Sequence, residues 1–287
     1  MSRHNPALDG LRALSVTAVV LYHAGALSGG WVGVEVFFVI SGFLITGLLA
    51  AEHERNGRID LVGFWRRRAR RLLPGIVMLA AIAAAYLWTY RDTRPSTTAG
   101  RDMVGLLTYT SNWVSIGGDG YWGQFEAPSV LRHAWSLAIE EQYYLVFPLI
   151  AAVLLRRRAF GRGLAVLTAV ALAWQVVASY RFDADRLYLG TDTRAFGLLA
   201  GGVLALGLRR RPIAGPRARA VLVAVGLAAL GVLTAMSIGF GDAGPASFRG
   251  WFQLLVLASA AAILAVHDAD HPTVVGRLVG SRPLALV

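Results

Sequence analysis

An arginine and a histidine near the start of the chain are spaced so that they share one face of a helix. Arg12 and His23 are eleven residues apart, which on an α-helix brings both side chains to one face, about 16 Å apart along the axis. Asp9 lies three residues before Arg12 and is close enough to pair with it. A histidine with one ring nitrogen fixed by a partner removes protons from hydroxyl groups. The spacing therefore predicts a polar stripe that joins an arginine to a candidate general base.

A carboxylate near the start of the next apolar segment is a candidate partner for this histidine. Glu35 lies about four residues inside that segment, and His23 lies about four residues from the outer end of the first one. We expect the two at similar depth on neighbouring helices, with Glu35 orienting or charge-stabilising His23. The alternative is a structural histidine that is hydrogen-bonded by a serine or a backbone carbonyl.

Three more ionisable residues fall inside apolar segments, where they are costly and indicate function. Glu140 and Glu141 lie near the outer end of one segment, and Arg194 lies near the outer end of another. We expect them to approach the level of His23 and to bind a substrate or stabilise charge. The alternative is mutual neutralisation, such as Arg194 with a glutamate, that holds the helices together.

A basic run from Phe64 to Pro74 contains five arginines. Guanidinium groups bind phosphates through paired hydrogen bonds, so the run is a candidate site for an anionic ligand. The alternative is a basic segment beside the membrane that sets orientation and contacts anionic lipid.

The composition requires these residues to sit in a membrane protein. Of 287 residues, 56% are hydrophobic and only 16% are charged, and the mean hydropathy is +0.54. Such a chain has too little polar surface for a water-soluble globule and too much apolar content for a disordered one. Cysteine is absent, which excludes disulfides, thiolate zinc sites and a cysteine nucleophile. The net charge of +11 fits cytoplasmic loops better than a nucleic-acid partner.

Apolar segments predict an all-α polytopic transmembrane bundle with about eight or nine spans. The candidate spans are 9–27, 31–50, 75–90, 134–155, 163–180, 191–208, 220–238 and 250–266. The segment 102–117 is interrupted by polar residues, and we expect it to be re-entrant or interfacial. Nineteen loop arginines then fall on one side and seven on the other, which predicts a cytoplasmic N-terminus. Residues 1–287 form one domain in this interpretation.

Four motifs occur in a family-specific order. They are Leu8-Asp9-Gly10-Leu11-Arg12-Ala13-Leu14 with Tyr22-His23, residues 33–45, Arg71-Leu72-Leu73-Pro74, and Trp135-Ser136-Leu137 with Glu140-Glu141-Gln142. In these motifs the chain resembles the acyltransferase-3 family of membrane O-acyltransferases. The resemblance implies transfer of an acyl group, often acetyl, from cytoplasmic acyl-CoA to a hydroxyl of an extracytoplasmic or membrane-associated acceptor. Most acceptors in the family are carbohydrates or glycoconjugates, and some are antibiotics.

The resemblance also implies roles for the candidate residues. His23, with Glu35, becomes the catalytic pair, and Arg12, Arg68 and Arg71 become the acyl-CoA ligands, although Arg67 and Arg70 have the same spacing. Glu140, Glu141 and Arg194 become acceptor-binding or charge-stabilising residues. No metal and no tightly bound cofactor are expected, with acyl-CoA, especially acetyl-CoA, as co-substrate. The partners are then the lipid bilayer, acyl-CoA and a carbohydrate or glycoconjugate, and the location is the inner membrane of a bacterium.

Two departures from the family leave alternatives open. Glu35 stands where the family more usually has aspartate, and the chain stops at Val287, so we expect it to lack the last helix of the family. Chemistry at His23 is open between general-base catalysis and an acyl-histidine intermediate. The alternatives to an acyltransferase are a transporter or flippase that uses the same intramembrane charges, and a non-catalytic fragment.

Overall fold

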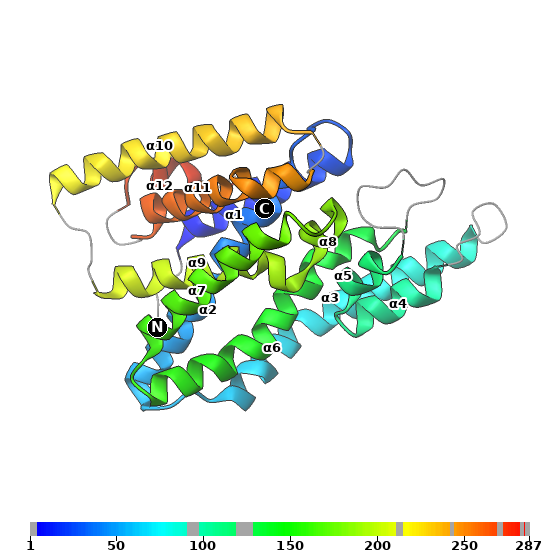
Figure 1. Cartoon of the computed structure of the whole chain (residues 1–287), viewed down its shortest axis with the longest axis horizontal. Helices are drawn as coiled ribbons and strands as arrows, with labels where there is room; N and C mark the ends of the chain where they lie inside the picture. The colour runs from blue at the N-terminus through cyan, green and yellow to red at the C-terminus, as the bar shows by residue number, and fades with distance from the viewer. Residues whose placement is uncertain are drawn as a thin grey trace.

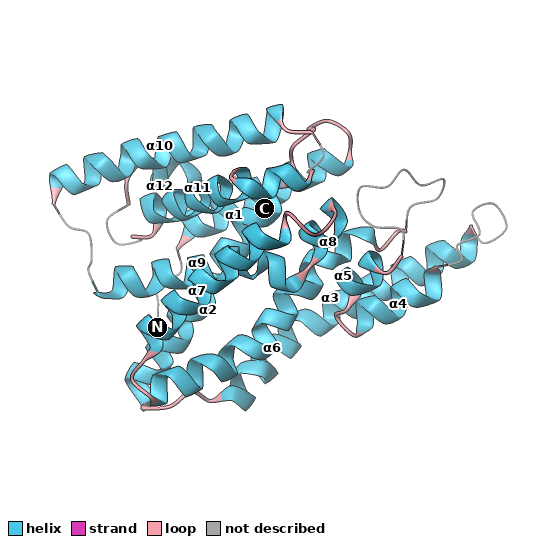
Figure 2. Cartoon of the chain, in the orientation of Figure 1, coloured by secondary structure: helices cyan, strands magenta, loops and turns pink. Residues whose placement is uncertain are grey.

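The computed structural model describes residues 5–90, 98–118, 129–210, 215–241, 244–268, 272–281 and 284. Within these ranges the chain folds into twelve α-helices and two short 3-10 helices, with no strand (Figure 2). The predicted all-α class is therefore confirmed for the described residues. Five arginines used in the topology prediction lie outside them, namely Arg3, Arg91, Arg94, Arg211 and Arg282.

Two helices form the centre of the bundle. Helix α2 (Val32–Asn56) packs along α9 (Thr191–Arg210). The helices approach closely because glycine faces backbone: a Cβ atom on Gly42 would overlap the backbone oxygen of Leu198, and one on Gly201 would overlap that of Val39. Small residues at such contacts are typical of helix packing in membranes.

The other helices surround this pair (Figure 1). Helices α1 (Pro6–His23) and α11 (Trp251–Val266) contact α2, while α10 (Pro216–Gly239) and α12 (Val274–Val279) pack around α11. On the other side lie α3 (Leu61–Thr89), η1 (Arg132–Ala134), α6 (Trp135–Arg156), α7 (Phe160–Ala178) and α8 (Ala184–Leu189). The short η2 (Pro245–Arg249) packs against α11.

Five helices are long and apolar enough to cross a membrane: α2, α3, α6 together with η1, α7 and α10. The apolar window of α2 is 72% buried in the bundle, whereas that of α3 is 11% buried. Helix α3 therefore presents most of its apolar surface outward, as a lipid-facing helix does. The larger count of eight or nine spans stays a prediction, since α11 has 16 residues and α1 and α9 carry several charged residues.

The interrupted segment 102–117 forms two short helices, α4 (Ala99–Leu107) and α5 (Ser111–Ile116). The chain reverses at Tyr109, which has a φ of 55°, and a Cβ atom on Gly105 would lie 3.1 Å from the Cα of Ser111. The two helices thus fold against each other, and each is far shorter than the roughly 20 residues of a spanning helix.

The helix ends separate into two groups. Helices α2, α6 and α9 end, and α3, α7 and α10 begin, at the left of Figure 1. These are the ends that carry the arginine-rich connections. The predicted topology requires the arginine-rich connections to lie on one side, as they do here. The orientation of the bundle in the membrane stays a prediction.

The α2–α9 contact predicts a stability effect at Gly42. Gly42→Ala places a methyl group on the backbone of Leu198, and such overpacking costs about 3 kcal/mol or more of folding free energy. The matched control is Gly47→Ala on the same helix, where a Cβ atom meets open space and alanine improves helix propensity by up to about 1 kcal/mol. Thermal unfolding of the purified protein in detergent measures both. Equal melting temperatures for the two variants would contradict the close contact.

Candidate active site

The face of α1 that carries Arg12 and His23 borders a cavity of about 240 Å³. The cavity lies between α1, α2 and α6 and has a mostly apolar lining: Val16, Val19, Val20, Val34, Phe37, Phe38, Ser136, Leu137 and Glu140. The three valines of α1, Val16, Val19 and Val20, lie between Arg12 and His23 in the sequence and share their helix face. The predicted stripe on α1 is therefore one wall of an apolar pocket, which sequence reasoning did not find.

His23 is the last residue of α1, and its side chain is exposed. Its Nδ1 atom lies 2.8 Å from the backbone oxygen of Val19. A carbonyl oxygen only accepts hydrogen bonds, so Nδ1 carries the proton and Nε2 is the basic nitrogen of the neutral ring. The group that orients the His23 ring is therefore a backbone carbonyl and not Glu35.

Glu35 turns away from α1 and pairs with Arg194. Its carboxylate is 1% exposed, and Oε2 lies 2.5 Å from the Arg194 guanidinium. Gly33 packs against the Ser15 backbone of α1, and two residues further on an α-helix turns by about 200°, which directs Glu35 toward α9. Gly197 leaves the space that the carboxylate occupies. The predicted His23–Glu35 pair is therefore corrected to a Glu35–Arg194 pair.

Aromatic rings enclose the other side of Arg194. Its guanidinium carbon lies 4.5 Å from the ring centre of Phe252, 5.0 Å from that of Tyr188 and 5.5 Å from that of Phe38. Its side chain is fully buried, so in this structure it stabilises the bundle instead of meeting an acceptor outside it. The sequence left open the alternative that a glutamate neutralises Arg194. In the structure this glutamate is Glu35.

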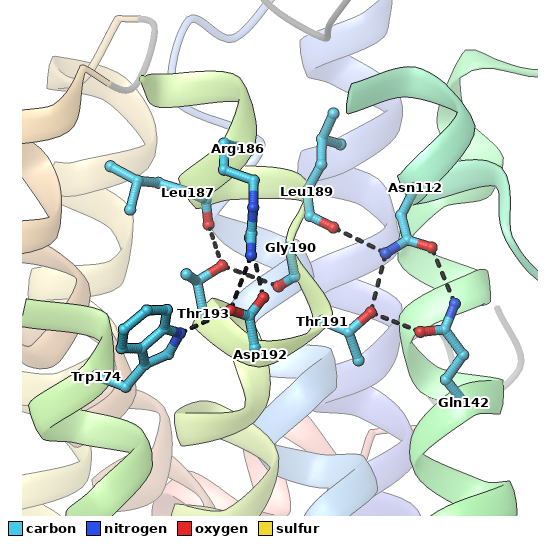
Figure 3. A network of polar contacts seen from close by, with 10 residues as sticks. All are labelled: Asn112, Gln142, Trp174, Arg186, Leu187, Leu189, Gly190, Thr191, Asp192 and Thr193. Carbon is cyan, nitrogen blue, oxygen red and sulfur yellow. Dashed lines mark hydrogen bonds and ion pairs between the residues drawn. The ribbon is translucent and has the colours of Figure 1, made fainter. Parts of the chain in front are cut away.

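A hydrogen-bond network anchors the start of α9 (Figure 3). Asn112 donates from Nδ2 to Thr191 Oγ1 and to the Leu189 backbone oxygen, both at 2.9 Å. Gln142 donates to Asn112 Oδ1 at 2.9 Å, and Thr191 donates to Gln142 Oε1 at 2.5 Å. These bonds join α5, α6 and α9 one turn before Arg194, and so they hold the arginine in place.

A second part of the network fastens α9 to α7 and α8. Arg186 donates two hydrogen bonds of 2.9 Å to the Asp192 carboxylate. The indole of Trp174 donates to the same carboxylate at 2.6 Å. The two partners of Asp192 lie on other helices, so the sequence alone does not reveal this contact.

Glu140 lies between the cavity and the arginine-rich helix. It accepts hydrogen bonds from the hydroxyl groups of Ser41 and Tyr144, and the Arg68 guanidinium carbon lies 3.7 Å above the Tyr144 ring centre. Glu141 is within electrostatic reach of Arg68 and Arg71. The structure thus brings the two glutamates near the predicted acyl-CoA arginines, whereas we expected them to approach the level of His23.

The structure also separates the two arginine pairs of equal spacing. Arg67 pairs with Glu52 at 3.7 Å, and Glu52 also accepts a hydrogen bond from the Asp60 backbone at 2.9 Å. Arg67 therefore fastens the α2–α3 connection. Arg68 lies over the Tyr144 ring of α6, and both Arg68 and Arg71 interact electrostatically with Glu141 of the same helix. These two arginines are therefore the better candidates for ligand binding.

Comparison with known proteins agrees with the motifs. The family described as an acyltransferase domain matches residues 5–272. The O-acetyltransferase OatA of Staphylococcus aureus is 35% identical over 99% of this chain and 48% of its own length. The peptidoglycan O-acetyltransferase OatA of Listeria monocytogenes is 33% identical over 98% of this chain and 47% of its own length. The chain thus spans about half the length of these curated relatives, and it belongs to the acyltransferase-3 family. No solved structure matches it.

The buried ion pair predicts a large stability effect at Glu35. Glu35→Gln leaves the buried Arg194 without a counter-charge and costs about 3–5 kcal/mol of folding free energy. The matched control is Glu54→Gln, whose partner Arg209 is at the surface, where such pairs contribute less than about 1 kcal/mol. Thermal unfolding in detergent compares the two variants. We expect the double variant Glu35→Gln, Arg194→Met to recover part of the lost stability. A loss at Glu35 no larger than that at Glu54 would contradict the role of the pair.

Proposed function

We propose that this chain is the membrane unit of an O-acyltransferase that moves an acetyl group from acetyl-CoA to a hydroxyl of a cell-envelope carbohydrate. The family and its O-acetyltransferase relatives support the reaction class. The name of the Listeria relative points to peptidoglycan as a carbohydrate acceptor. The observation that carries the proposal is His23 with its Nδ1 bound to a carbonyl, at the end of a helix face that lines an apolar cavity.

The donor binds through the arginines in this proposal. Arg68 and Arg71 hold the phosphates of acyl-CoA, for which guanidinium groups are well suited. The thioester arm runs in the apolar cavity along α1, between Arg12 and His23. Val16 and Phe37 are among the residues that line this path, and apolar lining favours the carbon-rich arm over water.

The reaction needs one proton carrier. Nε2 of His23 takes the proton of the acceptor hydroxyl as its oxygen attacks the thioester carbonyl carbon. The carbon–sulfur bond then breaks, and the imidazolium returns the proton to the sulfur, which leaves as CoA thiol. In the acyl-histidine route, Nε2 attacks the thioester first and the hydroxyl attacks the acyl-histidine. Both routes need the same tautomer of His23.

The distribution of arginines over the loops supports a direction for acyl transfer across the membrane. Arginine-rich connections lie at one end of the bundle, and such loops stay in the cytoplasm. We propose a cytoplasmic N-terminus, a cytoplasmic donor and an acceptor on the opposite side of a bacterial cell membrane. His23, at the far end of α1 from Asn5, then meets the acceptor.

Loss of transfer at His23 is the first test. Base-releasable acetyl on envelope carbohydrate is measured in a deletion strain complemented with wild type, His23→Ala, His23→Gln or the control His267→Ala. His267 also has Nδ1 on a backbone oxygen, that of Leu264 at 2.6 Å, but it follows α11. We expect rescue by wild type and His267→Ala only. Normal acetylation with His23→Gln at equal expression would refute the mechanism, and unchanged acetylation on deletion would favour a transporter.

The donor arginines give a second prediction. Arg68→Ala and Arg71→Ala each remove a charge-assisted hydrogen bond to phosphate, worth about 1.5–3 kcal/mol, and raise KM for acetyl-CoA by roughly 10- to 100-fold. The control is Arg70→Ala, an exposed arginine of the same helix. Initial rates against acetyl-CoA concentration measure the effect in membrane vesicles. An unchanged KM in both variants would exclude these arginines from the donor site.

A further inference from the structure

A second histidine lies beside His23, next to the helices that line the cavity. The ring centres of His23 and His133 are 6.3 Å apart, and the ring planes meet at 78°. His133 belongs to η1, immediately before α6, and is exposed like His23. The two rings come from segments 110 residues apart, so only the fold brings them together. They are near enough to act on two atoms of one small group, such as a carbonyl carbon and its oxygen.

The two histidines end two matching walls of the same cavity. On α1 the wall consists of Val16, Val19 and Val20, followed by His23. On α6 it consists of Ser136, Leu137 and Glu140, preceded by His133. His133 lies in η1, three residues before Ser136, which lines the cavity, so it directly precedes this wall. We therefore expect an arm that fills the cavity to end near the two rings.

The chain holds His133 firmly although its side chain is exposed. The neighbouring Ala134 and Trp135 are 4% and 2% exposed, and the Trp135 ring lies 4.5 Å from the ring of Tyr188. The Ala134 backbone N–H donates to the Leu131 oxygen at 2.9 Å. An exposed imidazole on so constrained a backbone is suited to bind a group in fixed geometry.

We propose that His133 is a second catalytic residue, which donates a hydrogen bond to the oxygen of the acyl carbonyl while the acceptor hydroxyl attacks. The inference rests on the proposed function. The bond between the hydroxyl oxygen and the acyl carbon forms, and electrons move to the carbonyl oxygen, which His133 stabilises. They return as the carbon–sulfur bond breaks, and His23 carries the hydroxyl proton to the sulfur. His133 keeps its own proton, so the reaction balances without another reactant.

Two substitutions separate hydrogen bonding from ring packing. His133→Phe keeps an aromatic ring beside His23 but has no donor, whereas His133→Gln loses the ring and keeps an N–H donor. Loss of one such donor lowers kcat by about 100- to 1000-fold in other enzymes. We expect that loss for His133→Phe, with KM for acetyl-CoA unchanged, and a loss of at most about tenfold for His133→Gln. His267→Phe, at a histidine that follows α11 and belongs to neither α1 nor η1, should leave kcat unchanged.

The measurement uses the whole protein in membrane vesicles with radiolabelled acetyl-CoA and peptidoglycan strands, with melting temperatures recorded for every variant. If wild type transfers acetyl and His133→Gln exceeds His133→Phe in kcat, the inference stands. If wild type transfers acetyl and His133→Phe equals or exceeds His133→Gln, the ring only packs and the role of His133 is refuted. If wild type transfers no acetyl to any carbohydrate, the proposed function fails, and the inference falls with it.

Discussion

One buried ion pair constrains the centre of this bundle. Glu35 on α2 and Arg194 on α9 are both almost fully buried, and either charge alone would be very costly away from water. The pair is possible only because Gly197 leaves room for the carboxylate, and it holds α2 and α9 in one register. Phe38 transmits this register to the site, since one of its faces meets Arg194 and the residue also lines the cavity.

The charged residues of the candidate site are arranged in order along the cavity. Arg68 and Arg71 lie beside Glu141 and Tyr144, and Glu140 hydrogen-bonds Tyr144 where the cavity begins. Apolar side chains follow, and on α1 His23 comes after the cavity-lining valines. Such an order separates an arginine region from a histidine region by an apolar space. In the proposed reaction, the phosphates and the reacting carbonyl of one donor would occupy the two regions together.

Two of the charge-bearing helices, α1 and α9, are identified poorly by hydropathy. Helix α1 contains Asp9 and Arg12, and α9 contains Asp192 and Arg194. Neither is among the five helices that qualify as spans by length and composition, although α9 lies at the centre of the bundle against α2. Arg12 pairs with Asp9 within α1, whereas Arg186 and Trp174 compensate Asp192 from other helices. Composition along one helix cannot register that compensation, because it comes from other helices.

The sequence by itself determined the helical class, the family motifs, and the face of α1 that joins Arg12 to His23, because the period of an α-helix is fixed by local geometry. It also marked the arginine-rich run as a candidate phosphate site. Only the tertiary structure decided that Glu35 turns to Arg194, that Arg68 and not Arg67 faces α6, and that His133 reaches His23. Those outcomes depend on which neighbour each helix face meets. That choice follows from close contacts such as Gly42 against Leu198, which join residues far apart in the chain.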